Sequence, residues 1–152
     1  MELTTSRPTE TEARTEQVTA APAGRRVRVL AIDDNEDFRT TLKELLEPLG
    51  FEVHTAANPV KALEIFTRDK NSYELVLLDY YMPQLDGAKT FEWLRKLNPN
   101  VKVIIVSGAE ELRLRQIQVQ HPIDGYIHKP FRVTEAVQLI QRVMRVPAPA
   151  TN

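Results

Sequence analysis

Apolar runs alternate along the chain with stretches in which apolar residues recur every three or four positions. Short, uniformly apolar runs are typical of strands that are buried on both faces of a parallel sheet. The recurring stretches have the spacing of amphipathic helices. The pattern predicts strands at residues 27–32, 51–56, 75–78, 101–106 and 124–128.

A predicted helix follows each predicted strand. Helices are expected over residues 36–49, from residue 59 onward, and over residues 89–97, 110–120 and 133–145. Gly50 is placed to end the first helix, and Pro48 in its last turn can shorten it. Asn58 and Pro59 are typical of the cap and first turn of the second. Five βα units in a row imply right-handed crossovers and a doubly wound α/β fold.

The length and composition indicate one folded domain between two tails. A chain of 152 residues, 42% hydrophobic and 27% charged, is sized for one globular domain, here residues 25–146. Residues 1–24 are nearly free of large apolar side chains, so we expect them to be disordered. Residues 147–152 contain two prolines and are expected to form a short disordered tail. The chain is either a single-domain protein or a piece of a longer one.

Charge and composition exclude several classes of protein. A net charge of -1 argues against general affinity for nucleic acid or for an anionic membrane. The absence of cysteine excludes disulfides and thiolate metal sites. No apolar stretch approaches the roughly 20 residues that span a bilayer, and the N-terminus lacks the apolar core of a signal peptide. We therefore expect a cytoplasmic protein.

Polar side chains that suit metal and phosphate chemistry stand where predicted strands end. They are Asp33 and Asp34 after the first strand, Asp79 after the third, Ser107 after the fourth and Lys129 after the fifth. Because parallel strands end at one edge of a sheet, we expect these groups to converge. Three carboxylates can hold a hard divalent cation, and a lysine with a hydroxyl can bind a phosphoryl group.

Each of these residues also has a purely structural interpretation. Asp33 and Asp34 could cap the first helix, Ser107 could begin a turn, and Lys129 could be a surface lysine before a proline. Their joint placement at strand ends favours the functional interpretation. A magnesium phosphatase with an aspartate nucleophile would require an Asp-x-Asp pattern after the first strand, which the run Asp33-Asp34-Asn35 lacks.

Some conspicuous residues favour a structural role. Trp93 and Phe91 lie in one predicted helix, and core packing is the expected account of both. Arg113 and Arg115 are expected to form a solvated helix face, with docking of a partner as the alternative.

Four motifs in this order resemble the receiver domain of response regulators, the phospho-accepting switch of two-component signalling. They are the acidic pair Asp33-Asp34, the run from Asp79 to Gly87, the hydroxyl of Ser107, and the run from Tyr126 to Phe131. The resemblance covers about residues 26–145. It implies the flavodoxin-like receiver fold, a five-stranded parallel sheet in the order 2-1-3-4-5 with five helices. It also implies a cis peptide bond before Pro130.

The resemblance assigns a role to each group that would contact phosphate. Asp79 would be the phosphoacceptor, whose carboxylate attacks phosphorus and becomes an acyl phosphate. Lys129 would pair with one phosphoryl oxygen, and Ser107, which replaces the more frequent threonine, would donate a hydrogen bond to another. The inward movement of Ser107 would let Tyr126 rotate. The face made by the fourth helix, fifth strand and fifth helix would change as a result.

Mg²⁺ is the cofactor that the resemblance implies. Asp34 and Asp79 would ligate it directly, Asp33 would act at least partly through water, and the backbone carbonyl of Tyr81 would be a further ligand. The Tyr81 side chain is bulkier than many members carry at this position. We expect its ring to shield the acyl phosphate from water, unless the ring turns outward to solvent.

The implied function is a signalling switch that catalyses only its own phosphorylation and dephosphorylation. The phosphoryl group would come from a sensor histidine kinase or a histidine phosphotransfer protein. The output would pass to a protein partner that the sequence does not identify, without direct binding of nucleic acid or membrane. Two alternatives remain open: a phosphorelay intermediate that passes the group to a histidine phosphotransfer protein, and a receiver-fold adaptor whose binding ignores phosphate.

Overall fold

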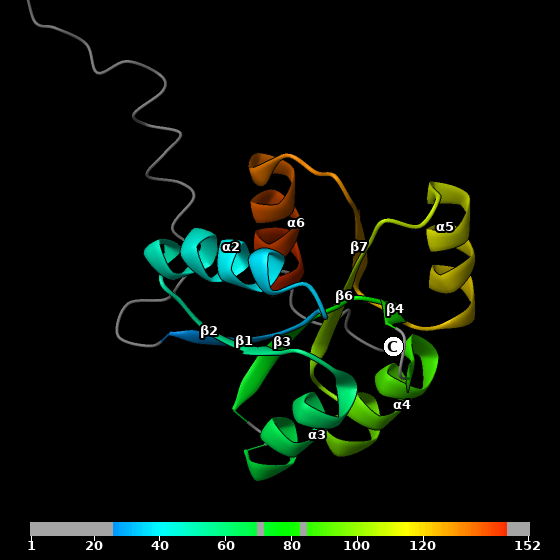
Figure 1. Cartoon of the computed structure of the whole chain (residues 1–152), viewed down its shortest axis with the longest axis horizontal. Coiled ribbons are helices and arrows are strands. Elements are labelled where there is room, and N and C mark those ends of the chain that lie inside the picture. Colours follow the sequence, from blue (N-terminus) through cyan, green and yellow to red (C-terminus); the bar gives the residue numbers. More distant parts are fainter. Residues whose placement is uncertain (1–25, 70–71, 83–84, 146–152) are drawn as a thin grey trace, which may run out of the picture.

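The computed structural model describes residues 26–69, 72–82 and 85–145. The strands of its main sheet are β1 Val27–Ile32, β2 Phe51–Ala56, β3 Tyr73–Leu78, β6 Lys102–Ser107 and β7 Gly125–His128. All neighbours pair in parallel, in the order β2-β1-β3-β6-β7 (Figure 1). Numbered within this sheet alone, that is 2-1-3-4-5, so the predicted fold and strand order are confirmed.

Helices cover both faces of the sheet. They are α2 Glu36–Leu46, α3 Pro59–Arg68, α4 Gly87–Leu97, α5 Glu111–Gln120 and α6 Val133–Arg145. Buried residues of α2 and α6 share one core cluster, and those of α3, α4 and α5 share the other. Figure 1 shows α2 and α6 on one side of the sheet and α3 and α4 on the other. A short 3₁₀ helix, η1 Glu47–Leu49, follows α2, because Pro48 has no N–H to continue the α-helical ladder. Gly50 ends it with a φ of 95°, as predicted.

Alternate residues of the central strand β3 face the two helical layers. Val76 and Leu78 belong to the cluster with α3, α4 and α5, whereas Leu75 and Leu77 belong to the cluster with α2 and α6. Each of these side chains is at most 2% exposed. Burial on both faces explains why this strand is apolar without interruption. Polar groups of the sheet are therefore confined to its edges and strand ends.

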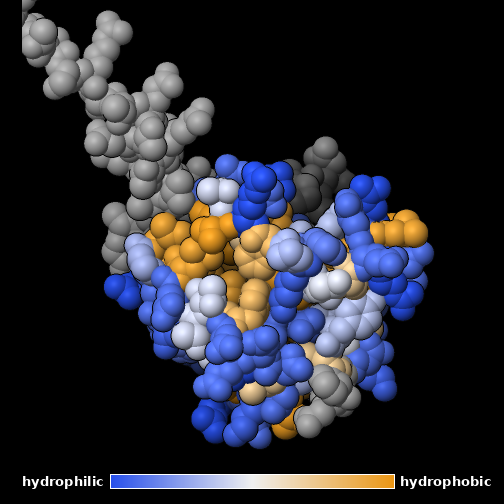
Figure 2. Space-filling view, turned by 45° about the horizontal axis from the view of Figure 1, so that its top comes forward, coloured by the Kyte–Doolittle hydropathy of each residue, from blue (hydrophilic) through white to orange (hydrophobic). Residues whose placement is uncertain are grey.

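The α2 and α6 layer leaves part of its core at the surface. Figure 2, which brings this side of the molecule forward, shows apolar side chains gathered in one area with hydrophilic side chains around them. The partly buried hydrophobic residues that pack against this cluster are Phe38, Leu49, Phe131, Leu139, Val143 and Met144. Two of them, Phe38 and Phe131, adjoin the candidate functional site.

Helix α2 begins at a cap that the sequence analysis did not identify. The side chain of Asn35 accepts a hydrogen bond from the backbone N–H of Phe38 at 3.0 Å. Asn35 therefore satisfies the helix start, and the interpretation of Asp33 and Asp34 as caps is wrong. Both carboxylates remain available for other partners.

The segment between β3 and α4 is more regular than the sequence predicted. A short antiparallel pair, β4 Tyr81–Met82 and β5 Leu85–Asp86, replaces the expected loop. Helix α4 then begins at Gly87, before the expected residue 89. The cause is Asp86, whose carboxylate accepts a hydrogen bond from the N–H of Ala88 at 3.0 Å and so caps the helix earlier.

The two aromatic side chains of α4 lie in different environments. Phe91 is 3% exposed and packs in the core, as predicted. Trp93 is 54% exposed, so the expectation of core packing for it is wrong. Residues two positions apart on a helix do not share a face, and burial of Phe91 directs Trp93 away from the core. The indole lies beside Lys96, whose Nζ is 6.0 Å from the ring centroid.

The predicted tails, residues 1–24 and 147–152, lie outside the described residues, so the domain limits at 25 and 146 stay predictions. Among the helices of the described ranges, none is long and apolar enough to cross a membrane.

We expect Gly87→Ala to destabilise the protein by about 1–3 kcal/mol. A Cβ at residue 87 would overlap the carbonyl oxygen of Tyr80 and stand 2.8 Å from its Cα, and backbone atoms cannot move aside without a large cost. Gly108→Ala is the matched control, because a Cβ there meets nothing within 4 Å. Urea unfolding measures both variants, and equal stabilities would contradict the close approach of α4 to Tyr80.

Candidate functional site

The predicted site residues lie at the carboxyl edge of the parallel sheet. Backbone hydrogen bonds continue one residue beyond the strand ends and hold this edge together. The N–H of Asp79 donates to the carbonyl of Ile32 at 2.9 Å, and the N–H of Lys129 donates to the carbonyl of Ser107 at 2.8 Å. The end of β3 is thereby joined to the end of β1, and the end of β7 to the end of β6.

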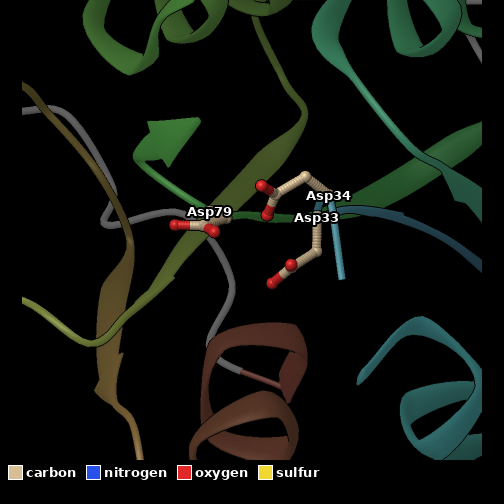
Figure 3. Close-up of side chains that lie close together, drawn as sticks. All are labelled: Asp33, Asp34 and Asp79. Atoms are coloured by element: carbon tan, nitrogen blue, oxygen red, sulfur yellow. The ribbon is translucent and has the colours of Figure 1, made fainter. Parts of the chain in front are cut away.

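Three carboxylates from two adjacent strand ends form the centre of the site (Figure 3). One oxygen of each of Asp33, Asp34 and Asp79 lies within 4.8 Å of the corresponding oxygens of the other two. Asp33 is 2% exposed and Asp79 is 8% exposed, whereas Asp34 is exposed. Two of the three negative charges are therefore poorly solvated.

Lys129 supplies the positive charge that contacts these carboxylates. Its Nζ lies 2.5 Å from Asp33 Oδ2 and 3.9 Å from Asp79 Oδ2. Asp33 also accepts a hydrogen bond from the backbone N–H of Asn35 at 2.9 Å. The peptide bond between Lys129 and Pro130 is cis, as the resemblance implied. The ammonium group thus contacts two of the three carboxylates, and its principal partner is Asp33.

The environment of Asp79 disfavours its charged form. Burial raises the pKa of its carboxyl from 3.8 to about 6, and the negative charges of Asp33 and Asp34 act in the same direction. The N–H of Tyr81, which donates to Asp79 Oδ1 at 3.1 Å, and the Lys129 ammonium lower that pKa in part. A further cation beside Asp79 would therefore relieve an existing electrostatic cost.

The composition of the cluster fits a hard divalent cation. All the side-chain donors are carboxylate oxygens, which Mg²⁺ prefers to nitrogen and sulfur. The exposed Asp34 leaves one side of the cluster in contact with solvent, as suits an ion that keeps several of its waters. The residues present therefore fit the predicted cofactor.

Ser107 and Tyr126, the predicted switch residues, lie on adjacent strands. Ser107 is 1% exposed, and its Oγ accepts a hydrogen bond from the N–H of Ala109 at 3.3 Å. Tyr126 pairs with Ile105 across the β6–β7 ladder and is partly exposed. An interaction with Tyr126 raises the pKa of the exposed Arg115 guanidinium on α5. The Tyr126 side chain therefore adjoins α5.

The Tyr81 side chain extends from the site to α5. Its hydroxyl accepts a hydrogen bond from Arg113 Nε at 2.9 Å, and its ring packs edge-on against Tyr80 with centroids 5.4 Å apart. Tyr81 is nevertheless 45% exposed. Arg113 and Arg115 are exposed, as expected, but Arg113 is bonded to Tyr81 and the Arg115 guanidinium interacts with Tyr126, which the sequence analysis missed. No local signal could have identified partners so distant in the sequence.

A second contact missed by the sequence analysis concerns Lys129. Its Nζ lies 3.9 Å from the ring centroid of Phe38 in α2. Phe38 packs against the core, and its ring also meets the ammonium group.

Comparison with known proteins finds relatives over the same part of the chain. The family model described as the response regulator receiver domain matches residues 29–141. The transcriptional regulatory protein CpxR homolog of Haemophilus influenzae is 34% identical over 125 residues, which are 82% of this chain and 53% of that protein. The chain thus spans about half the length of this curated relative.

Solved structures of similar proteins share the fold. A response regulator receiver domain protein of Clostridium thermocellum has a TM-score of 0.71 and 30% identity, covering 78% of this chain and 94% of that one. The response regulator TrrA of Thermotoga maritima, solved in complex with Mg²⁺ and BeF, has a TM-score of 0.67 and 30% identity. That match covers 77% of this chain and 98% of TrrA.

We expect Asp79→Asn to stabilise the metal-free protein at pH 7.5. A pKa of about 6 in place of 3.8 means that ionised Asp79 costs at most about 3 kcal/mol, and we expect a gain of about 1–3 kcal/mol in the free energy of unfolding. Because this pKa is raised on folding, the folded state binds more protons between about pH 4 and pH 6. The contribution of Asp79 to stability therefore falls as the pH rises through that window.

The measurement is urea unfolding in EDTA at pH 7.5 and at pH 4.5. The advantage of Asp79→Asn should be largest at pH 7.5 and should shrink at pH 4.5. Asp37→Asn, on the exposed first turn of α2, is the control for loss of one solvated charge. If Asp79→Asn is no more stable than the wild type at pH 7.5, the charge of Asp79 does not destabilise the folded protein.

Proposed function

Because the chain belongs to the response regulator receiver domain family, a family of phospho-accepting signalling domains, we propose that it takes a phosphoryl group onto Asp79. The donor is a sensor histidine kinase or a histidine phosphotransfer protein. The observation that carries the proposal is the buried Asp79 carboxylate, with two further carboxylates and one ammonium group around it. We also propose a cytoplasmic location, where such donors present their phosphohistidine.

The transfer is a displacement at phosphorus. An oxygen of Asp79 attacks and forms the P–O bond of an acyl phosphate, while the P–N bond of the phosphohistidine breaks and the imidazole retains its electron pair. The carboxylate and the incoming phosphoryl group are both negative, so positive charge must be near. Lys129, 3.9 Å from Asp79, supplies part of it and orients one phosphoryl oxygen.

Mg²⁺ would be held by Asp34 and Asp79, by Asp33 at least partly through water, and by the backbone carbonyl of Tyr81. When bound, it supplies the positive charge that offsets the repulsion between the carboxylates and the phosphoryl oxygens. The cluster of three carboxylates supports this assignment. The protein itself holds the three carboxylates together and buries two of them, Asp33 and Asp79, away from solvent.

Phosphorylation would change the partner of Lys129. The ammonium is now paired with Asp33 at 2.5 Å, and a phosphoryl group on Asp79 adds about two negative charges beside it. These charges compete with Asp33 for the ammonium. The ion pair of Lys129 would thereby shift when Asp79 becomes phosphorylated.

Ser107 would provide the second response. Its Oγ accepts a hydrogen bond from Ala109, which leaves the hydroxyl proton free to be directed to a phosphoryl oxygen. Such a charge-assisted bond is worth roughly 1.5–3 kcal/mol, enough to change a two-state ratio by about tenfold to over a hundredfold. The inward movement of Ser107 leaves room for Tyr126 to rotate, which would change its interaction with Arg115.

The output surface that we propose is the face of α5, β7 and α6. A groove of about 560 Å³ lies there. Its lining includes Tyr126, His128, Phe131, Glu135 and Arg142. A protein partner that binds here and fits only the rotated conformation of Tyr126 would bind the phosphorylated form preferentially. The buried carboxylates, whose charges favour a bound cation, support such a phosphate-dependent switch over a phosphate-independent adaptor.

Asp79→Asn should abolish labelling by acetyl phosphate, because the amide oxygen is too weak a nucleophile to attack phosphorus. Removal of Mg²⁺ with EDTA should abolish labelling of the wild type as well. Asp37→Asn is the control and should be labelled normally. The readout is intact-protein mass spectrometry, and undiminished labelling of Asp79→Asn would refute the assignment of the phosphoacceptor.

Asp34→Ala and Lys129→Ala should separate metal binding from phosphate binding. The loss of a charged ligand in Asp34→Ala should lower Mg²⁺ affinity by about tenfold or more. Lys129→Ala should change Mg²⁺ affinity by less than about threefold, but should uncouple phosphorylation from the change at Tyr126. Calorimetry and the NMR signals of Tyr126 measure the two effects. An equal loss of Mg²⁺ affinity in both variants would mean that this division of roles is wrong.

Tyr81→Ala should shorten the half-life of the acyl phosphate by about two- to tenfold, because the ring limits the approach of an in-line water. Mg²⁺ affinity should not change, since the proposed ligand is the backbone carbonyl. Tyr81→Phe keeps the ring but loses the bond to Arg113, so an intermediate half-life is expected, and Arg113→Ala should match it. A half-life in Tyr81→Ala that equals or exceeds that of the wild type would exclude shielding.

A further inference from the structure

The ammonium group of Lys129 lies against an aromatic face as well as against carboxylates. Its Nζ is 3.9 Å from the ring centroid of Phe38, well inside the roughly 6 Å within which a cation is attracted by a π system. The same nitrogen lies 2.5 Å from Asp33 Oδ2. Since the lysine side chain is only 24% exposed, the ring takes the place of water beside the ammonium.

Two contacts hold Phe38 in place. The backbone N–H of Phe38 donates to the capping side chain of Asn35 at 3.0 Å, which fixes the first turn of α2. Its ring packs perpendicular to that of Phe131, with centroids 5.8 Å apart and an interplanar angle of 88°. Phe131 lies two residues after Lys129 and also lines the groove beside β7. Phe38 is thus a fixed surface on which the ammonium rests.

The proposed function requires the ammonium to move while it remains in the site. It must pass from Asp33, its present partner, to a phosphoryl group on Asp79. A further carboxylate in the place of Phe38 would compete for the ammonium and oppose this exchange. An aromatic face attracts the ammonium without directional hydrogen bonds, so it can hold the charge out of bulk water in both positions.

We propose that Phe38 is a positioning residue for Lys129, whose aromatic face holds the ammonium group where it meets the incoming phosphoryl group. The inference rests on the proposed role of Lys129 in phosphorylation and adds a residue to it. An aliphatic side chain of similar size at position 38 would fill the space but could not hold the charge. Loss of the aromatic face should therefore slow phosphorylation without altering Mg²⁺ binding.

The test varies the electrostatics of the ring at nearly constant size. Phenylalanine with one, two or three ring fluorines is incorporated at position 38, and the rate of labelling by limiting acetyl phosphate is measured with saturating Mg²⁺. The logarithm of the rate should fall in step with the number of fluorines, by about 3- to 30-fold over the series. Phe38→Leu should resemble the trifluorinated protein, and Phe38→Trp should retain the wild-type rate.

Two controls separate an electrostatic role from a packing role. The same fluorinated series at Phe131, which touches Phe38, should give a flat response. In a Lys129→Ala background the dependence on fluorine at position 38 should disappear, because no ammonium remains for the ring to hold. In addition, the Hε protons of Lys129 should show an upfield ring-current shift that Phe38→Leu removes.

The outcomes distinguish this inference from the function on which it rests. A flat fluorine series at position 38, or an equal slope at positions 38 and 131, would overturn the role of Phe38 and leave Asp79 and Lys129 as proposed. A Lys129→Ala protein that is labelled at the wild-type rate would overturn the role of Lys129, and that of Phe38 with it.

Discussion

The ion pair between Asp33 and Lys129 is the interaction on which the rest of the site depends. It joins the end of β1 to the end of β7 across the carboxyl edge of the sheet, at 2.5 Å and with Asp33 2% exposed. Because the Lys129 ammonium lies closer to Asp33 than to Asp79, it offsets the negative charge of Asp79 only in part. The three carboxylates therefore carry more negative charge than the one ammonium group offsets, and a bound divalent cation would reduce this excess.

The fold creates this imbalance by simple means. The strand order places β1 and β3 side by side, so that Asp33, Asp34 and Asp79 meet although they leave different strands. Asn35 caps α2, so neither neighbouring aspartate is needed as the cap, and Asp33 Oδ1 accepts the N–H of Asn35 at 2.9 Å. The same first turn presents Phe38 to the ammonium. The first turn of α2 therefore lies beside both the acidic cluster and the ammonium group of Lys129.

The sheet and the acidic cluster could be predicted because both follow from local patterns. Buried parallel strands require uninterrupted apolar runs, and polar residues at their ends must then share one edge. What could not be predicted depends on contacts between distant residues, such as Phe38 with Lys129 and Arg113 with Tyr81. Trp93 was misassigned for a related reason, since helical apolarity alone does not say which side faces the core.

The central claim is that Asp79, and neither of its acidic neighbours, carries the phosphoryl group. Borohydride reduces an acyl phosphate to an alcohol and so converts a phosphorylated aspartate into homoserine, which peptide mapping by mass spectrometry locates. After reaction with acetyl phosphate and Mg²⁺, the account predicts homoserine at position 79 and intact aspartates at positions 33 and 34. Homoserine at position 33 or 34, or at none of the three, would contradict it.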